Sequence, residues 1–192
     1  MTPPAGLSFQ RLTASQAREQ RETVEDVFRR SYVEAIDAGD LFEAPAEFMH
    51  RFGAYTSPTR AGDFELVFAY LDGKPVGQTW GWPLLPDTIW WQISRLDIAD
   101  TDLAAFTHET GNRTFALSEI MVCNEYAGRG IARALQDELL NGRREQRATL
   151  LVDPQNSRAY NRYSRWGWRR VGTMRPDWPD APTFDVLVRS LM

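Results

Sequence analysis

The chain has 192 residues, 43% of them hydrophobic and 25% charged, which suits one globular domain with a buried core. Its net charge of -4 argues against a nucleic-acid partner, because such partners normally meet a basic face. One cysteine excludes an internal disulfide and a thiolate metal cluster, and two distant histidines argue against a His-rich metal site, so we expect no metal. No apolar run approaches ~18 residues and no signal-peptide core is present, so we expect a cytoplasmic protein without a membrane partner.

The first third of the chain predicts a strand and two helices. Residues 7–12 predict a short strand. Apolar residues recur at three- and four-residue spacing over 14–38, which predicts one long helix that Gly39 ends. A shorter helix is predicted over 46–55, with Pro45 near its start.

The rest of the chain mixes strands and helices. Two strands, 64–70 and 76–82, predict a hairpin through the turn Asp72-Gly73, and 83–111 shows no regular pattern. Further strands are predicted over 114–123, 149–152, 168–173 and 184–191, and further helices over 128–142 and 156–166. This order predicts a mixed α/β fold with one twisted mixed sheet of six to seven strands and helices on both faces.

The most informative stretch is the glycine-bearing turn between the strand 114–123 and the helix that follows. Residues 127–132 read Ala-Gly-Arg-Gly-Ile-Ala. A helix that begins here leaves backbone N–H groups free at its positive end, which is a site for a pyrophosphate, and Gly128 and Gly130 let a phosphate approach closely. The stretch lacks the Lys and Ser/Thr of a Walker A loop, and Arg133 stands where a dinucleotide fingerprint needs its third glycine. A phosphorylated cofactor is therefore expected.

At this point the chain resembles the GNAT superfamily of acyl-CoA-dependent N-acetyltransferases. The family's acetyl-CoA segment, a strand followed by Arg/Gln-x-x-Gly-x-Gly/Ala, corresponds to 127–132, with Val122 at the end of the strand. A second family segment, Asn-x-x-Ala, then Tyr, then aromatic-Gly-aromatic, corresponds to Asn156, Ala159, Tyr163 and Trp166-Gly167-Trp168. The family's first Arg or Gln is Ala127 here. Since backbone N–H groups hold most of the pyrophosphate, we expect the cofactor site to survive, with Arg129 or Arg133 supplying charge.

The resemblance, strong over 114–172 and by element order elsewhere, implies direct transfer of an acetyl group from acetyl-CoA to an amine, with coenzyme A as product. It implies that the strand holding Val122 splays from the strand 149–152, that pantetheine lies in the gap, and that the N–H of Val122 polarises the thioester carbonyl. The residues expected to bind the cofactor are Met121, Val122, Ala127, Gly128, Arg129, Gly130, Ile131, Ala132, Arg133, Asn156, Ala159 and Tyr163.

Two residues are candidates for proton transfer. Tyr163, on the family's tyrosine position, is the candidate acid for the leaving thiolate, with a packed aromatic as the alternative. Glu119, three residues before Val122 in an apolar strand, is the candidate base. Burying an unpaired carboxylate is costly, so a carboxylate at this position needs a reason, and proton transfer is one. Its alternatives are a structural pair with an arginine or a solvent-facing residue, and His108, Glu109 or a water chain are other routes for the proton. Cys123 is expected to be a buried structural cysteine, with a covalent acyl carrier as the alternative.

A cluster of aromatic residues is the main clue to the substrate. Four tryptophans fall within twelve positions. One interpretation is core packing; the other is a pocket for an aromatic or amphipathic amine, with Trp178, Asp177 and Asp180 at its mouth. Its opposite wall would come from Phe28, Tyr32, Phe48 and Phe52 on the N-terminal helices. The substrate candidates are Trp80, Trp82, Trp90, Trp91, Phe28 and Tyr32.

The leading prediction is an N-acetyltransferase that acts on the primary amine of a small molecule in a ternary complex. Acetylation of a protein or peptide amine, and a non-catalytic acyl-CoA-binding regulatory module, are the alternatives. We expect one acetyltransferase domain over 1–192, with the acetyl-CoA segment over 114–172 and substrate-side elements over 14–60, 80–112 and 174–183. No nucleic-acid partner is expected, and a homodimer remains open because members of this superfamily often dimerise.

Overall fold

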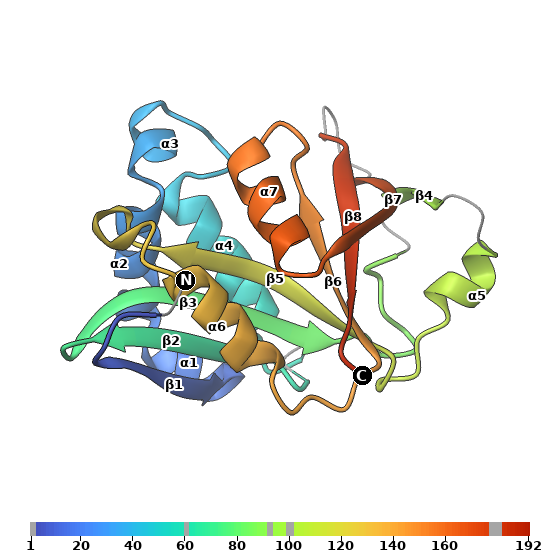
Figure 1. Cartoon of the computed structure of the whole chain (residues 1–192), viewed down its shortest axis with the longest axis horizontal. Coiled ribbons are helices and arrows are strands. Elements are labelled where there is room, and N and C mark those ends of the chain that lie inside the picture. Colours follow the sequence, from blue (N-terminus) through green and yellow to red (C-terminus); the bar gives the residue numbers. More distant parts are fainter. Residues whose placement is uncertain (1–2, 60–61, 92–93, 99–101, 177–181) are drawn as a thin grey trace. The chain divides into compact units, whose positions relative to one another are not determined.

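The computed structural model describes residues 3–59, 62–91, 94–98, 102–176 and 182–192. Within these ranges the chain forms a mixed α/β fold with eight strands and seven α-helices (Figure 1). It divides into two compact units, which we call the first unit (Met1–Trp82 and Glu119–Asn141) and the second unit (Pro83–Ser118 and Gly142–Met192). The predicted fold class is confirmed. The prediction of one acetyltransferase domain over 1–192 stays a prediction.

The first unit contains three antiparallel strands, the end of a fourth strand and five of the helices. Strand β1 pairs antiparallel with β2, and β2 with β3. Asp72 and Gly73 join β2 to β3 with φ angles of 51° and 76°, the backbone of the predicted tight turn. The elements are β1 (Leu7–Thr13), α1 (Ala14–Glu19), α2 (Arg21–Ser31), α3 (Val33–Asp37), α4 (Pro45–Tyr55), β2 (Glu65–Leu71), β3 (Lys74–Pro83), the end of β5 (Thr114–Val122), the 3₁₀ turn η1 (Asn124–Tyr126) and α6 (Ile131–Leu140).

The prediction of a single helix over 14–38 is wrong, because this segment forms three helices, α1, α2 and α3. The breaks fall at Gln20 (ψ 18°) and Tyr32 (ψ 26°), where the backbone leaves the helical region for one residue. Helical hydrogen bonds resume at once, from Val24 N to Gln20 O and from Ile36 N to Tyr32 O, both 3.0 Å. The apolar spacing is therefore preserved across each break, which is why the periodicity could not reveal the bends.

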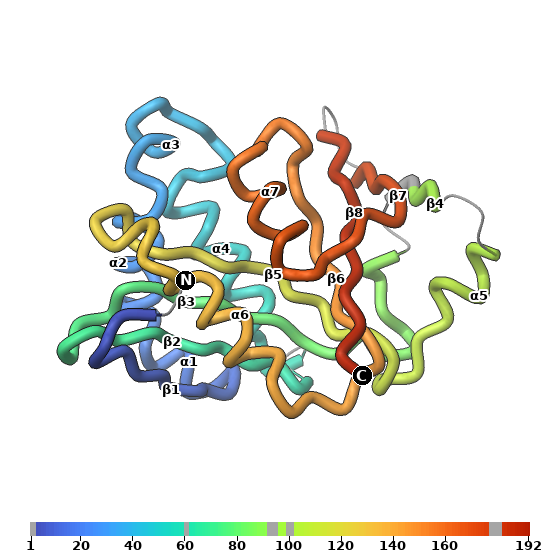
Figure 2. The backbone as a smooth tube through the Cα atoms, viewed as in Figure 1, coloured from blue at the N-terminus to red at the C-terminus, as the bar shows by residue number. Residues whose placement is uncertain are grey.

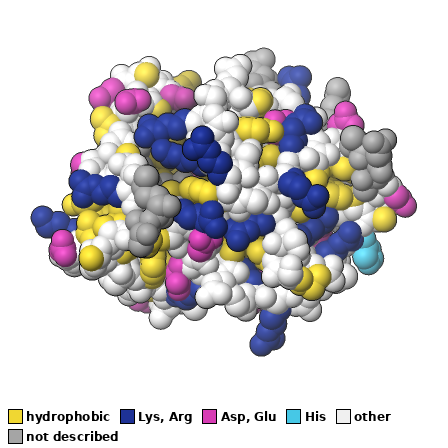
Figure 3. Space-filling view, viewed as in Figure 1, with side chains coloured by type: hydrophobic (Ala, Val, Ile, Leu, Met, Phe, Trp, Pro, Cys, Tyr) yellow, Lys and Arg dark blue, Asp and Glu magenta, His cyan; other side chains and the backbone are white. Residues whose placement is uncertain are grey.

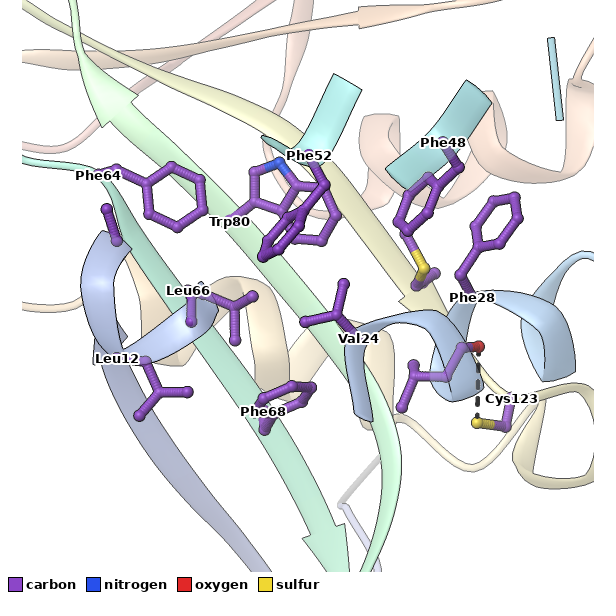
Figure 4. Close-up of a cluster of buried hydrophobic side chains, with 14 residues drawn as sticks. Leu12, Val24, Phe28, Phe48, Phe52, Phe64, Leu66, Phe68, Trp80 and Cys123 are labelled. Carbon is purple, nitrogen blue, oxygen red and sulfur yellow. Dashed lines mark hydrogen bonds between the residues drawn. The ribbon is translucent and has the colours of Figure 1, made fainter. Parts of the chain in front are cut away.

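The core of the first unit is an aromatic layer between the strands and helices α2 and α4 (Figure 4). The rings of Phe28 and Phe48 stack with centroids 3.7 Å apart. Phe48 and Phe52 pack against Trp80 at 5.7 and 5.6 Å. Helix α4 is therefore anchored through its apolar face onto β3, with Pro45 at its first turn as the sequence predicts.

The second unit is built on five strands and two helices. Strand β5 pairs parallel with β6, and antiparallel pairs join β6 to β8, β8 to β7 and β7 to β4. Its elements are β4 (Ser94–Ile98), α5 (Leu103–Thr107), the start of β5, β6 (Arg147–Val152), α7 (Ser157–Arg165), β7 (Arg169–Pro176) and β8 (Phe184–Ser190). The strand order is β1-β2-β3-β5-β6-β8-β7-β4.

Strand β4 and helix α5 lie in the segment that showed no regular pattern, so the sheet has eight strands instead of six to seven. Both elements have five residues, too few for a periodicity to be read. Pairing with Met174 and its neighbours on β7 makes β4 a strand. The side chain of Asp102 starts α5 by accepting hydrogen bonds from the N–H groups of Ala104 and Ala105.

The ladder between β5 and β6 is short. It covers three residue pairs and ends at Ala116 and Thr149, although β5 goes on through Ser118 in the same unit and β6 continues to Val152. An early end to the ladder agrees with the splay that the family resemblance implies. None of the helices in the described ranges has the length and apolar content needed to cross a membrane.

Candidate active site

The glycine-bearing loop lies between β5 and α6 in the first unit, where the chain leaves the strand, turns sharply and returns along the helix (Figure 2). Gly128 and Gly130 have φ angles of 80° and 82°, a region that side chains rarely adopt. Helix α6 therefore begins at Ile131, three residues later than predicted, because both glycines sit outside the helix. Arg30 anchors the loop by donating from Nε to Glu125 Oε1 over 2.9 Å.

The start of α6 fits an anion. Gly130, its N-cap residue, has no side chain to accept from the first N–H groups, and the first turn carries no acidic residue. A Cβ built on Gly128 would meet nothing within 4 Å, so the loop surface is open. These N–H groups and the helix dipole suit the pyrophosphate of a coenzyme A compound.

Two arginines flank this loop in different ways. The guanidinium of Arg129 lies 5.2 Å from the ring centroid of Tyr126, on the loop itself. Arg133 donates from Nε to Asp137 Oδ2 over 2.6 Å, one turn along the helix. We therefore expect Arg129, the more exposed of the two, to meet a phosphate first.

The end of β5 presents the expected oxyanion donor. Cys123 N donates to Val76 O of β3 over 3.0 Å. Since successive N–H groups of a strand point to opposite edges, the N–H of Val122 points away from β3. Met121 and Ile131 are buried, so a cofactor would meet them through their backbone, whereas Ala127 is exposed and Ala132 is half-buried.

Glu119 is a half-buried residue whose carboxyl group has a strongly raised pKa. Burial, and then the negative charge of Glu43, raise the pKa of Glu119 to about 7, while the positive charge of Arg51 opposes them. Thr79 holds the backbone here by donating from Oγ1 to Glu119 O over 2.7 Å. A carboxyl group with a pKa near 7 suits a general base at neutral pH.

Cys123 is a buried cysteine whose thiol faces Val27 O at 4.0 Å. Burial raises the pKa of Cys123 to about 11. Since the thiolate is the nucleophile, this environment disfavours the covalent alternative and agrees with a structural role.

Three of the expected cofactor residues, Asn156, Ala159 and Tyr163, lie in the second unit, on or just before α7. Asn156 is the N-cap of α7, because its Oδ1 accepts from Ala159 N over 3.0 Å. Tyr163 packs edge-on against Trp166 and Trp168, with ring centroids 5.7 and 6.1 Å away, and stays half-buried. Lys and Arg side chains gather on the face of the molecule over α7 (Figure 3). This helix carries three arginines and no acidic residue.

The aromatic substrate candidates fall into both units. Trp80 and Phe28 are 1% and 0% exposed, as core packing requires, and Trp80 Nε1 finds no acceptor among the described residues. Tyr32 and Trp82 are half-buried. The remaining pair, Trp90 and Trp91, belongs to the second unit. The residues expected at the mouth of the pocket, Trp178, Asp177 and Asp180, lie outside the described residues.

Sequence reasoning missed Glu43 and Arg51, the two charges that act on Glu119. A signal was present for Arg51, which lies three residues after Phe48 and one before Phe52, on the buried side of α4. A charged residue in that position needs a partner. Within the described residues, no cluster of His, Cys, Asp and Glu could hold a metal ion. Among the other routes considered for the proton, His108 is exposed and Glu109 is buried in a network of its own.

Similar folds occur in several solved structures. A GNAT-family acetyltransferase from Streptococcus agalactiae 2603 is 11% identical, with a TM-score of 0.69 over 98% of each chain. The PaiA N-acetyltransferase from Thermoplasma acidophilum in complex with coenzyme A is 14% identical, with a TM-score of 0.55 over 96% of this chain and 98% of that one. A spermidine N-acetyltransferase SpeG chimera from Vibrio cholerae and hSSAT is 13% identical, with a TM-score of 0.62 over 97% and 96%. At such identities these likenesses show the fold alone.

The family is shown by the match of the sequence to a family model. No curated protein sequence matches the chain. The family model of the acetyltransferase (GNAT) family matches residues 22–168, which is most of the chain and includes both predicted segments. This family uses acetyl-CoA, so the expected cofactor is confirmed at the level of the family. The chain belongs to the GNAT acetyltransferase family.

Proposed function

We propose that the protein transfers an acetyl group from acetyl-CoA to the primary amine of a small molecule, by direct attack in a ternary complex. The observation that carries this proposal is the raised pKa of Glu119, about 7. Glu119 lies three residues before Val122 on the same strand. A carboxyl group with a pKa near 7 suits a general base at neutral pH, because a large fraction of it is ionised and the carboxylate is still basic enough to accept a proton.

Each residue then has a defined task. When bound, acetyl-CoA supplies an activated thioester. The loop 127–132 and the start of α6 would hold its pyrophosphate through N–H groups, and the N–H of Val122 would stabilise negative charge on the thioester carbonyl oxygen. Glu119 accepts the proton that an ammonium group must lose before it can attack. Tyr163 is the proposed acid that returns a proton to the thiolate.

Acidic and aromatic residues of the first unit support an amine as the acceptor. The negative charge of Glu43 acts on Glu119. In the same unit, the half-buried rings of Tyr55 and Trp82 pack together with centroids 4.9 Å apart. Aromatic faces and carboxylates attract an ammonium ion. A solved structure with a similar fold is a spermidine N-acetyltransferase, which gives precedent for an amine acceptor on this fold.

Thiol release from acetyl-CoA tests the proposed reaction directly. We expect one class among aminoglycosides, aromatic amines, polyamines and peptides to release free thiol, and Tyr163→Phe to slow that release by about 100-fold. Tyr160→Phe is the matched control, because it removes the same hydroxyl from a half-buried tyrosine on the same helix. If acetyl-CoA raises the melting temperature but no amine releases thiol, the non-catalytic binding module is the better account.

Charge placed at Gly128 tests the pyrophosphate site. Both Asp and Asn tolerate a positive φ, and the open space at Gly128 accommodates either side chain. Gly128→Asp adds a negative charge next to the phosphates, so we expect it to bind acetyl-CoA about 10-fold more weakly than Gly128→Asn, with the gap narrowing at high salt. Titration calorimetry at two salt concentrations measures this difference. Equal affinities of the two variants would contradict an anion site at this loop.

A further inference from the structure

Arg51 is held in one place by the segment just before α4. Its Nη1 donates to Phe42 O over 2.7 Å, and its guanidinium lies 3.9 Å from the centroid of the Phe42 ring. Its Nη2 lies 3.9 Å from Glu43 Oε2. Three different contacts therefore fix this guanidinium, which is more than a surface ion pair needs.

The side chains of both Arg51 and Glu43 are only 20% exposed. At such exposure solvent screens their charges weakly, so each acts on neighbouring ionisable groups over several ångströms. This separates the pair from the exposed Glu25–Arg29 pair on α2, whose side chains are 33% and 55% exposed.

The packing of α4 brings this pair towards Glu119. Gln78 Nε2 contacts Met121 Sδ at 3.3 Å across β3 and β5, so these two residues share a face of the sheet. Since side chains alternate along a strand, Trp80 and Glu119, each two residues away along its strand, lie on that same face. Phe48 and Phe52 of α4 pack on Trp80 (Figure 4), and Arg51 lies between them in the sequence.

The charged groups that act on Glu119 are Glu43, from the segment before α4, and Arg51, from α4. Their effects are opposite: the negative charge of Glu43 raises the pKa of Glu119 and the positive charge of Arg51 lowers it. Burial raises the pKa of Glu43 as well, with Asp40 adding to it and Arg51 opposing it. The guanidinium of Arg51 therefore lowers the pKa of both carboxyl groups, that of Glu119 and that of Glu43.

We propose that Arg51 and Glu43 are positioning residues that set the charge state of Glu119 in opposite directions and keep it able to exchange a proton near neutral pH. The inference rests on the proposed role of Glu119 as the base. Without Arg51, burial and Glu43 hold the Glu119 carboxyl in its protonated form, which cannot accept a proton. Without Glu43, burial still raises the pKa of Glu119, but the positive charge of Arg51 opposes it alone, so the carboxylate is a weaker base.

The test follows the ¹³C-labelled carboxyl of Glu119 by NMR titration, which does not depend on activity. We expect Arg51→Met to raise its midpoint by about one pH unit, and Glu43→Gln to lower it by about half a unit. Arg51→Lys keeps the charge, so its midpoint should stay near that of the wild type. The acid limb of the kcat/KM profile should move in the same direction in each variant.

The matched controls are Arg29→Met and Glu25→Gln, which break an ion pair on α2 and should leave the titration of Glu119 unchanged. A purely structural role for Arg51 predicts that Met and Lys act alike, and that outcome overturns the inference. So does an unchanged midpoint in Glu43→Gln, which leaves the anchoring contacts from Arg51 to Phe42 in place. A failure of the proposed function is seen separately, as full activity in Glu119→Gln.

Discussion

Replacing Glu119 by glutamine lowers kcat/KM by about 100- to 10,000-fold near neutral pH, the range that a positioned general base contributes. The wild-type profile falls below a pH near 7, where the pKa of about 7 leaves this carboxyl protonated. In the variant that limb disappears, and the remaining pH dependence comes from the ionisation of the amine. Steady-state thiol release across a pH series measures both effects, with acetyl-CoA affinity as the check that the cofactor site is intact.

The same substitution has a stability signature with a defined sign. Because the folded-state pKa of Glu119 is raised, its contribution to stability is present at low pH and is lost as pH rises through about 7. Glu119→Gln keeps a neutral side chain at every pH. We therefore expect the variant to match the wild type at about pH 4 and to exceed it by up to about 3 kcal/mol at about pH 8, less what partial exposure removes. Denaturant unfolding at the two pH values measures the difference, and a variant that is destabilised at both would contradict this account of Glu119.

Replacing Glu109 by alanine destabilises the protein by about 3 to 5 kcal/mol, because it leaves a largely buried guanidinium without its counter-ion. Glu109 is 3% exposed and accepts from Trp91 Nε1 over 3.0 Å and from Thr114 Oγ1 over 2.8 Å. Arg147 Nη2 lies 3.4 Å from the same oxygen. Denaturant unfolding followed by tryptophan fluorescence measures the loss of stability.

Arg147 is the reason for the size of this effect. It also donates to Thr114 Oγ1 and Phe106 O, both over 2.7 Å, and its guanidinium lies 4.2 Å from the centroid of the Phe106 ring. Burial and the nearby Arg113 lower the pKa of Arg147, so the positive charge is already disfavoured before its partner is removed. The network joins the start of β5, the start of β6 and the end of α5 within the second unit.

Two comparisons isolate the cause. Glu109→Gln retains an acceptor for Trp91 and Thr114 but loses the charge. It should therefore lower the free energy of unfolding, but by less than Glu109→Ala does. Glu25→Gln removes one partner of the exposed ion pair with Arg29 and should cost less than about 1 kcal/mol. Equal costs for Glu109→Ala and Glu25→Gln would show that the buried network contributes nothing.

Local chemistry was enough to locate the glycine-bearing turn and most strands. The strand, glycine turn and helix over 114–142 could be predicted because Gly128 and Gly130 adopt a positive φ that other residues avoid, which is a property of the residue type itself. The hairpin through Asp72 and Gly73 follows for the same reason.

The boundaries of the helices and strands, and the shortest elements, were harder to predict from the sequence. The bends at Gln20 and Tyr32 leave the apolar spacing of the N-terminal helices intact, so no pattern marks them. Strand β4 exists through its pairing with β7, whose residues follow more than seventy positions later in the chain. A partner so distant in sequence cannot be found from a five-residue segment alone.

The sequence by itself determined the family, the position of the glycine-bearing turn and the choice of Glu119 as the candidate base, because motifs are properties of neighbouring residues. Only the tertiary structure decided that Trp80 and Phe28 lie in the core and that Glu43 and Arg51 act on Glu119. Burial and electrostatic interaction depend on distances in space. Residues far apart in sequence, such as Glu43 and Glu119, acquire a common charge environment only when the chain folds.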